Sequence, residues 1–179
     1  MPPSLKIAAV VSPGTASFNF LYGVELALSN VNGGTVPHSD VLLPNTTLTV
    51  QVFNLAAANS TSGMVATARD VGASALLTAY GSAASIAMSQ AATLVKLPVL
   101  SGGATSTALS SAVSHPFFAR PVPADSKQSV ALVDLCRRFA WSHVATVHDP
   151  TDTYSVGLEQ GFWDNSGDAG IAVSRVEVV

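Results

Sequence analysis

The sequence predicts an α/β fold with a doubly wound, parallel sheet, and three observations support that prediction. Short apolar runs alternate along the chain with segments of helical hydrophobic spacing, as strand–helix–strand units require. Hydrophobic residues make up 48% of the 179 residues and charged residues only 11%, which suits parallel strands buried on both faces. Neither a short-period repeat nor a low-complexity tract interrupts this alternation.

Composition and charge exclude several classes of protein. The formal net charge is −3 at pH 7 and no basic patch is evident, so nucleic acid is not an expected partner. No apolar run approaches the ~20 residues that cross a bilayer. The amino end lacks the pattern of a secretion signal, so an export signal would lie outside this chain. The single cysteine, Cys136, rules out an internal disulfide.

Two strand–helix units are expected at the start of the chain. They are a strand at residues 6–11, a helix at 17–31, a strand at 47–53 and a helix at 63–71. The turn signal Ser12-Pro13-Gly14 ends the first strand, and Asn32-Gly33-Gly34 ends the first helix. Alternating β-branched residues mark the second strand, and a run of helix-capping residues at 59–62 precedes the second helix.

A further strand–helix–strand unit follows and is the centre of the prediction. It consists of a strand at 74–79, a tight turn, a helix at 84–96, a strand at 97–101 and a hydroxyl-rich loop at 102–106. Because such crossovers are right-handed, the two strands should lie parallel, with both loops at the same carboxyl edge. Open α/β sheets bind ligands at that edge. The small residues Ala84, Ala87, Ala91 and Leu94 are expected to face the sheet.

The loops of this unit suit a small anionic group. The first turn of the helix after Ser82 has unpaired N–H groups and the positive end of the helix dipole, which favour a carboxylate. The alternative is that Ser82 only caps the helix and Thr105 only closes a turn.

Three prolines in residues 115–123 indicate an extended connector, which can be neither a helix nor a central strand. We place the domain boundary there, between residues 1–119 and 120–179. Asp125 and Gln128 have the spacing of a capping box at the start of the next helix, whose buried face is expected to carry Leu132, Val133, Cys136, Phe139 and Ala140. A strand at 141–147, a helix at 154–165 and a strand at 171–178 complete the chain. Two strands are too few for a stable sheet, so the second domain is expected to be incomplete.

The order and spacing of several segments carry a resemblance to a known family. These are residues 23–32, Gly81-Ser82, Leu97-Pro98-Val99-Leu100, the loop 105–109, the connector 117–125 and residues 139–144. They resemble the receptor ligand-binding region of the type I periplasmic-binding-protein superfamily, across nearly the whole chain. The pattern is similar to the Venus-flytrap modules of class C G-protein-coupled receptors and natriuretic-peptide receptor cyclases. It implies a periplasmic-binding-protein-like I fold, with lobe one (1–119) and the start of lobe two (120–179).

The resemblance implies a function as well as a fold. It implies the extracellular ligand-binding region of a membrane receptor, part of a larger protein, that recognises a small molecule such as an amino acid between two lobes. No enzyme activity and no cofactor or metal are expected. Membrane attachment would use segments outside this chain, at the extracellular face of the plasma membrane, and lobe one could form a homodimer. Two N-x-S/T triplets, at Asn45 and Asn59, are candidate glycosylation sites that agree with this location.

Matching positions imply a set of ligand-binding residues: Gly81, Ser82, Ala83, Gly103, Thr105, Asp125 and Tyr154. Ser82 and the backbone N–H groups beside it would bind the α-carboxylate of an amino acid. Thr105 and Asp125 would bind its α-ammonium group, and Tyr154 would cover the ligand when the lobes close. A zwitterion needs donors on one side and acceptors, including one negative charge, on the other. The alternatives are a helix cap at Asp125 and a packed aromatic ring at Tyr154.

Several positions depart from the family pattern. Gly81 stands where a second serine is common, Gly102 and Gly103 stand where larger residues are usual, and Ser155 replaces a common glycine. The lobe-one disulfide of the family is impossible here. The loop at residues 12–16 has no Lys or Arg, whereas glutamate-sensing relatives keep a cation there, so glutamate is not the expected ligand.

Two other functions compete with the receptor hypothesis. A soluble amino-acid-binding protein of a transporter would have the same fold without membrane attachment. A doubly wound enzyme would need a catalytic motif, and the four histidines lack one. His148, Asp149 and Asp152 form the only titratable cluster, which a solvated loop explains.

Overall fold

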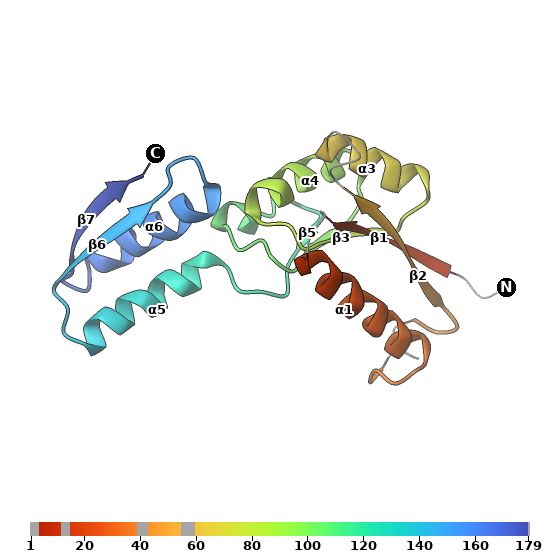
Figure 1. Ribbon diagram of the computed structural model, residues 1–179, viewed down its shortest axis with the longest axis horizontal. Coiled ribbons are helices and arrows are strands. Elements are labelled where there is room, and N and C mark those ends of the chain that lie inside the picture. Colours follow the sequence, from red (N-terminus) through yellow and green to blue (C-terminus); the bar gives the residue numbers. More distant parts are fainter. Residues whose placement is uncertain (1–3, 12–14, 39–42, 55–59, 179) are drawn as a thin grey trace.

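A computed structural model of the chain describes residues 4–11, 15–38, 43–54 and 60–178. Its strands form two parallel sheets, one of five strands in the order β2-β1-β3-β4-β5 and one of two strands, β6-β7 (Figure 1). We call the part that holds β1 to β5 the five-stranded unit and the part from α5 to β7 the two-stranded unit. The all-parallel sheet with helices between its strands confirms the predicted α/β, doubly wound fold.

The five-stranded unit contains β1 (Ser4–Val11), α1 (Thr15–Asn32), β2 (Thr47–Asn54), α3 (Thr61–Asp70), β3 (Ala75–Thr78), α4 (Ser82–Val95), β4 (Val99–Ser101), the 3-10 helix η2 (Thr107–Ser110) and β5 (Phe118–Ala119). The two-stranded unit contains α5 (Asp125–Arg138), β6 (His143–His148), α6 (Thr153–Ser166) and β7 (Ala172–Glu177). In the described part of the chain, no helix is both long enough and apolar enough to cross a membrane.

The core of the five-stranded unit lies between the sheet and two helices. α3 and α4 cover one face of the sheet, and α1 lies on the other face (Figure 1). Met64 of α3 and Met88 of α4 are fully buried against Ala8, Val10 and Leu76 of the sheet. Burial of these apolar side chains is the main favourable term in the stability of the unit.

The pairing of β3 with β4 positions the site. The two strands are parallel, with Leu76 opposite Val99 and Thr78 opposite Ser101. Their carboxyl ends therefore meet at one edge of the sheet, as predicted. α4 starts from the end of β3 at this edge, and the loop that leads to η2 starts from the end of β4.

The prediction of which face of α4 meets the sheet was wrong. Leu94 is 85% exposed, and the buried residues are Ser82, Ser85, Met88, Ser89 and Ala92. Two of these serines have partners for their hydroxyl groups: Ser85 Oγ donates to Tyr80 O (3.1 Å), and Ser89 Oγ lies 3.0 Å from Nδ1 of the buried His115. A polar side chain can line a buried face when it has such a partner. A prediction made from the spacing of hydrophobic residues alone does not find such positions.

The connector contains one strand that the sequence did not predict. Phe118 and Ala119 form β5, which pairs in parallel with β4 at the edge of the sheet. An edge position tolerates neighbouring prolines because one side of the strand needs no ladder partner.

The predicted capping box at α5 was also wrong. Ala124 is the N-cap, and Asp125 is the first helical residue. The Gln128 side chain donates to Asp125 Oδ1 at 3.2 Å, and so does not reach back to a backbone N–H group.

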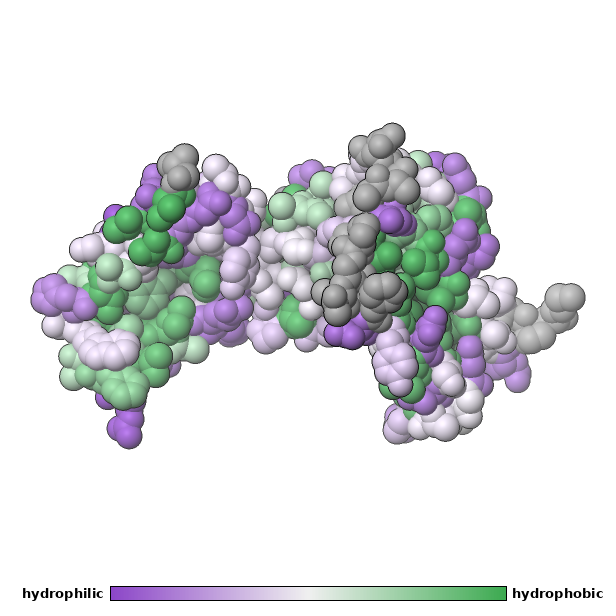
Figure 2. Space-filling model, viewed as in Figure 1, coloured by the Kyte–Doolittle hydropathy of each residue, from purple (hydrophilic) through white to green (hydrophobic). Residues whose placement is uncertain are grey.

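The two-stranded unit packs α5 and α6 together beside its sheet. Val133, Cys136, Phe162 and Ile171 form its buried cluster. Ser129 and Gly161 let the helices approach closely, because a Cβ at position 161 would lie 2.6 Å from Ser129 Oγ. Leu132 and Phe139, which were predicted to be buried, are 41% and 59% exposed. Figure 2 shows hydrophobic atoms gathered on this unit, where the short sheet and α5 cover little of each other.

Candidate functional site

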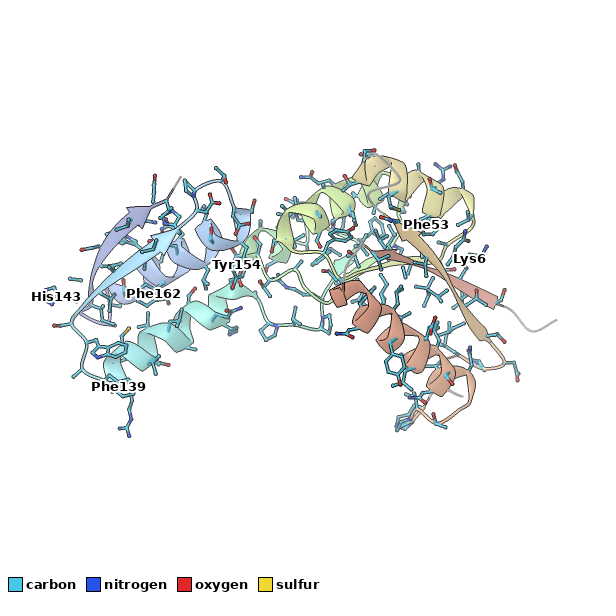
Figure 3. All side chains as sticks on the ribbon, viewed as in Figure 1. Lys6, Phe53, Phe139, His143, Tyr154 and Phe162 are labelled. Atoms are coloured by element: carbon cyan, nitrogen blue, oxygen red, sulfur yellow. The ribbon has the colours of Figure 1, made fainter. Side chains whose placement is uncertain are left out.

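A cleft of about 500 Å³ lies between the two units, where α4 and α6 both begin. It is lined by Gly81, Ser82, Ala83, Ala84, Gly103, Asp152 and Tyr154. The first five come from the carboxyl edge of the five-stranded sheet, and the last two come from the start of α6. Tyr154 lies at the junction of the two units in Figure 3. Residues about 70 positions apart therefore share one surface, as ligand sites between lobes require.

The first turn of α4 forms one wall of this cleft. Its N-cap residue is Gly81, which has no side chain to cap the helix. The N–H groups of the first helical residues have no intrahelical acceptor, and the helix dipole places partial positive charge there. The alternative in which Ser82 caps the helix is therefore wrong. This wall can donate backbone hydrogen bonds to an anionic group.

Ser82 joins this wall to the neighbouring loop. Its side chain is almost completely buried, and its Oγ accepts a hydrogen bond from Ser106 N at 3.1 Å. No acceptor for its hydroxyl hydrogen is present among the described residues, so the group can still donate. Ser82 thus has both a structural role and a free donor at the cleft.

Gly103 allows the loop after β4 to approach the end of β3. A Cβ at this position would lie only 2.8 Å from Ala79 O and 3.3 Å from Tyr80 O. The Ser101 hydroxyl orders the same loop by accepting from Gly103 N (3.3 Å) and Ala104 N (3.1 Å). The floor of the cleft therefore depends on a residue without a side chain.

Thr105, in the same loop as Gly103, and Asp125, at the start of α5, are not among the residues that line the cleft. Asp125 N donates to Thr105 O at 2.9 Å, so the start of α5 is tied to the loop. The Asp125 side chain is fully buried; Oδ1 accepts from Gln128, and Oδ2 has no partner among the described residues. A buried carboxylate oxygen without a donor is costly, so Oδ2 is a ready acceptor.

The wall from the two-stranded unit carries Tyr154 and Asp152. Asp152 is the N-cap of α6; its Oδ1 accepts from Tyr154 N (3.4 Å) and its Oδ2 from Ser155 N (3.0 Å). Asp152 was predicted to lie in a solvated loop and was not among the predicted site residues. Its position two residues before Tyr154 was the available signal, but capping explains an aspartate there equally well.

Arg120 is another residue that sequence reasoning missed. Its Nη1 donates to Ala104 O (3.2 Å) and Ser106 O (2.8 Å), and its Nη2 donates to Ser110 Oγ (2.5 Å). The guanidinium thus fixes the loop that holds Gly103. These carbonyls use its donors, so Arg120 acts as a support for the site.

An ion pair between the buried carboxylate of Glu159 and the exposed Arg175 fixes α6 to β7. Arg175 Nε donates to Glu159 Oε1 at 2.7 Å, Nη2 donates to Oε2, and Thr146 Oγ1 also donates to Oε1 (3.1 Å). The hydrogen bonds from Arg175 lower the pKa of Glu159, although burial alone would raise it. In the loop before α6, hydrogen bonds from Thr151 lower the pKa of Asp149.

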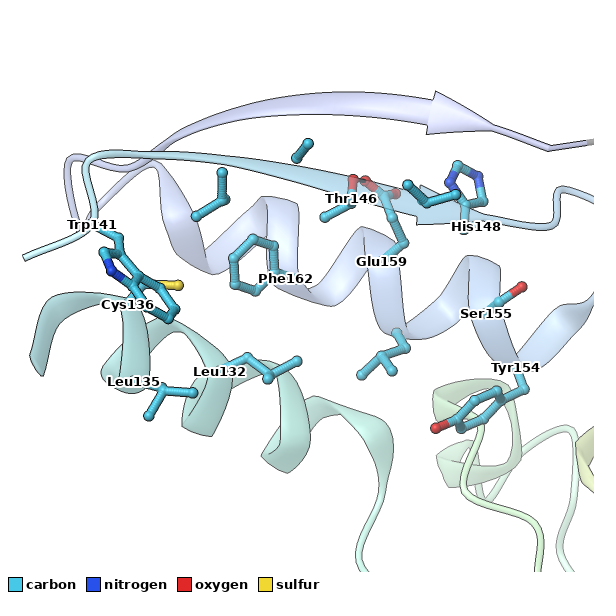
Figure 4. Close-up of a pocket in the computed structure, with 14 residues that line it drawn as sticks. Leu132, Leu135, Cys136, Trp141, Thr146, His148, Tyr154, Ser155, Glu159 and Phe162 are labelled. Carbon is cyan, nitrogen blue, oxygen red and sulfur yellow. Dashed lines mark hydrogen bonds between the residues drawn. The ribbon is translucent and has the colours of Figure 1, made fainter. Parts of the chain in front are cut away.

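A second, apolar cavity of about 340 Å³ lies within the two-stranded unit, between α5, β6 and α6 (Figure 4). Leu132, Trp141 and Phe162 line it, and Tyr154 stands at its end nearest the cleft. It offers few polar groups.

Across the described residues, no cluster of His, Cys, Asp and Glu side chains could hold a metal ion. Of the candidate glycosylation sites, Asn45 is exposed, and Asn59 lies outside the described residues.

Comparisons with known proteins agree with this architecture. A family model described as the receptor family ligand binding region matches residues 23–179. The chain is 32% identical over 97 residues to metabotropic glutamate receptor 4 of Macaca fascicularis; the match covers 54% of this chain and 11% of that receptor. It is 40% identical over 82 residues to the metabotropic glutamate receptor of Drosophila melanogaster, covering 44% of this chain and 8% of that receptor. The matches thus span about a tenth of these relatives.

Proposed function

The chain belongs to the receptor ligand-binding region family, and on that premise we propose that it senses an amino acid in the cleft between its two units. It would do so as part of the extracellular region of a membrane receptor related to class C G-protein-coupled receptors. In this proposal residues 1–119 form lobe one and residues 120–179 form part of lobe two. The metabotropic glutamate receptors among its relatives favour a receptor over a transporter-associated binding protein.

One observation carries the proposal: the uncapped first turn of α4 faces the start of α6 across a cleft. The α-carboxylate of an amino acid would accept hydrogen bonds from backbone N–H groups at Ser82 and Ala83 and from the Ser82 hydroxyl. Such charge-assisted hydrogen bonds are shorter and stronger than neutral ones. Gly81 and Gly103 would let the ligand come close to the backbone on either side.

The ammonium group of the ligand needs acceptors at the opposite side of its head group. Asp125 Oδ2 is the strongest acceptor near the second loop, because it is buried and has no partner among the described residues. We assign Asp125 and Thr105 to this end of the site, although neither lines the cleft in this structure. Closure of the two units would have to bring them to the ligand.

Closure would convert binding into a signal. Tyr154 and Asp152 belong to the two-stranded unit, whereas Ser82 and Gly103 belong to the five-stranded unit. A ligand that contacts both walls binds the closed state better than the open state, and therefore shifts the population toward closure.

The site is tested by comparing two buried serines of α4. Ser82→Ala removes a hydroxyl at the cleft, whereas Ser85→Ala removes one that bonds Tyr80 O and does not line the cleft. Both variants should lose about 1 kcal/mol of folding stability, because each breaks a buried hydrogen bond. Only Ser82→Ala should weaken amino-acid binding, by about tenfold in calorimetry. Equal affinity in the two variants would remove Ser82 from the site.

A thermal-shift screen of the twenty amino acids against the intact chain comes first, since it identifies the ligand for that comparison. At least one amino acid should raise the unfolding temperature, because a ligand that binds only the folded state stabilises it. A screen without any such ligand would contradict the proposed function.

A further inference from the structure

Asp152, at the start of α6, places a negative charge in the cleft, on the side opposite the first turn of α4. Among the described residues that line the cleft, Asp152 is the only one with a charged side chain. Its carboxylate is held by two backbone N–H groups of α6, at 3.4 and 3.0 Å. Each carboxylate oxygen has further lone pairs after accepting one hydrogen bond. Asp152 is therefore a fixed acceptor on the wall opposite Ser82.

Among the described residues, no Lys or Arg lines the cleft to offset this charge. The eight Lys and Arg residues all lie in the described segments, and none of them lines the cleft. Lys6 donates to Val71 O (2.8 Å), Arg120 donates to the loop after β4, and Arg175 pairs with Glu159. The others are Arg69 on α3, Lys96 at the far end of α4, and Lys127, Arg137 and Arg138 on α5.

The helix dipoles do not supply the missing positive charge. A helix N-terminus carries about half an elementary charge. At α6 this partial charge lies beside the full charge of Asp152, and its first N–H groups are already used by that carboxylate. At α4 the proposed function uses the corresponding groups for the α-carboxylate. A second carboxylate on the ligand would thus face Asp152 without a counter-charge.

From this arrangement we infer that Asp152 makes the cleft reject ligands with a second negative charge, so the ligand is an amino acid with an uncharged or cationic side chain. The inference rests on the proposed function, because it assumes that an amino acid binds there. The expected ligand therefore differs from the one in the names of its relatives. They are called glutamate receptors, and glutamate has an acidic side chain.

L-glutamine and L-glutamate provide the test, because they have nearly the same shape and differ in charge. Calorimetry on the intact chain should give an affinity for L-glutamine at least about tenfold higher than for L-glutamate. In Asp152→Asn the ratio should fall to about threefold or less, mainly through tighter binding of glutamate. Asparagine is as good an N-cap as aspartate, so α6 should fold normally.

Asp149→Asn is the matched control. Asp149 lies three residues earlier in the same loop, bonds Thr151 at 2.7 and 2.6 Å, and does not line the cleft. Its loss removes the same charge from the surface and should leave the glutamine-to-glutamate ratio unchanged. A similar effect in both variants would mean that general surface charge sets the preference, which would overturn the inference.

Other outcomes would also overturn it. If the original chain binds L-glutamate at least as tightly as L-glutamine, Asp152 does not select against acidic side chains. If Asp152→Asn weakens both ligands equally, the carboxylate contacts the α-ammonium group that they share, and selectivity comes from elsewhere. If the original chain binds no amino acid in the thermal-shift screen, the proposed function fails together with this inference. If the chain binds amino acids but Asp152→Asn leaves the glutamine-to-glutamate affinity ratio unchanged, this inference fails and the proposed function stands.

Discussion

At the scale of single residues, the cleft depends on how closely two loops approach each other. A hydrogen bond from Ser106 N to Ser82 Oγ joins the two loops, and bonds from two backbone N–H groups to Ser101 Oγ order the loop after β4. Gly103 lies against the backbone of Ala79 with no room for a methyl group. The adjacent Gly102 has open space around its Cα hydrogen atoms. The two glycines therefore have different roles, although they are neighbours in the sequence.

We expect Gly103→Ala to destabilise the protein by about 1–3 kcal/mol, because the added Cβ would overlap with the carbonyl group of Ala79. Gly102→Ala is the control: nothing lies within 4 Å of its added Cβ, and its folding free energy should change by less than about 0.5 kcal/mol. Urea unfolding of both variants checks the difference. Equal stabilities would show that the loop can move away from β3 at little cost.

Sequence reasoning located some of these residues and missed others for physical reasons. Ser82 was found because a hydroxyl after a buried strand, at the start of a helix, is a feature of the carboxyl edge of a parallel sheet. Asp152 was missed because capping and ligand binding require the same residue type at a helix N-terminus. Arg120 was missed because its acceptors are backbone carbonyl groups, which leave no trace in the sequence.

At the scale of helices and strands, hydrophobic spacing predicted the elements well and their buried faces less well. The strand–helix order of the five-stranded unit was predicted, except for β5, whose two residues are too few to give a pattern. The prediction of the buried face of α4 was wrong because serines lie on that face. Hydrogen bonds such as the one from Ser85 to Ser101 allow these polar side chains to be buried. Leu132 and Phe139 of α5 were expected in a core, but the two-stranded sheet is too small to cover them.

The ion pair between α6 and β7 makes the stability of the two-stranded unit depend on pH. Hydrogen bonds from Arg175 lower the pKa of Glu159 below its ordinary value of 4.5. A carboxyl with a lowered folded-state pKa contributes its full stabilisation above the unfolded-state pKa and loses it as the pH falls through the folded-state pKa. The contribution is therefore fully present at pH 7.

We expect Glu159→Gln to cost about 1–3 kcal/mol at pH 7, because it replaces a charge-assisted hydrogen bond with a neutral one. The difference between the two proteins should shrink as the pH falls below about 4.5. Thermal unfolding of both at pH 7 and at low pH checks this. Asp164→Asn is a suitable control, since Asp164 is an exposed acidic residue of the same helix that accepts from Gln160. A difference that stays constant with pH would mean that Glu159 acts through packing alone.

At the scale of the whole molecule, the candidate site exists only because two units meet. Asp125 N bonds to Thr105 O, and α4 contacts α6, so the connector and the start of α6 place the second wall beside the first. The fold class and the family could be recognised from the sequence, because both depend on element order along the chain. The position of Asp152 opposite the five-stranded unit could not be predicted from the sequence, because it depends on how the two units are oriented relative to each other.

Tyr154 tests whether closure couples the two walls. It is 38% exposed, like Val156 two residues later in the same helix, but only Tyr154 lines the cleft. An aromatic contact contributes about 0.5–1.5 kcal/mol beyond area burial, so Tyr154→Ala should weaken binding of the amino acid found in the screen by about three- to tenfold. At saturating ligand, small-angle X-ray scattering should show compaction of the original chain and of Val156→Ala, and less compaction of Tyr154→Ala. If all three compact equally, the ligand does not use Tyr154 to hold the units together, and closure must depend on contacts elsewhere on α6.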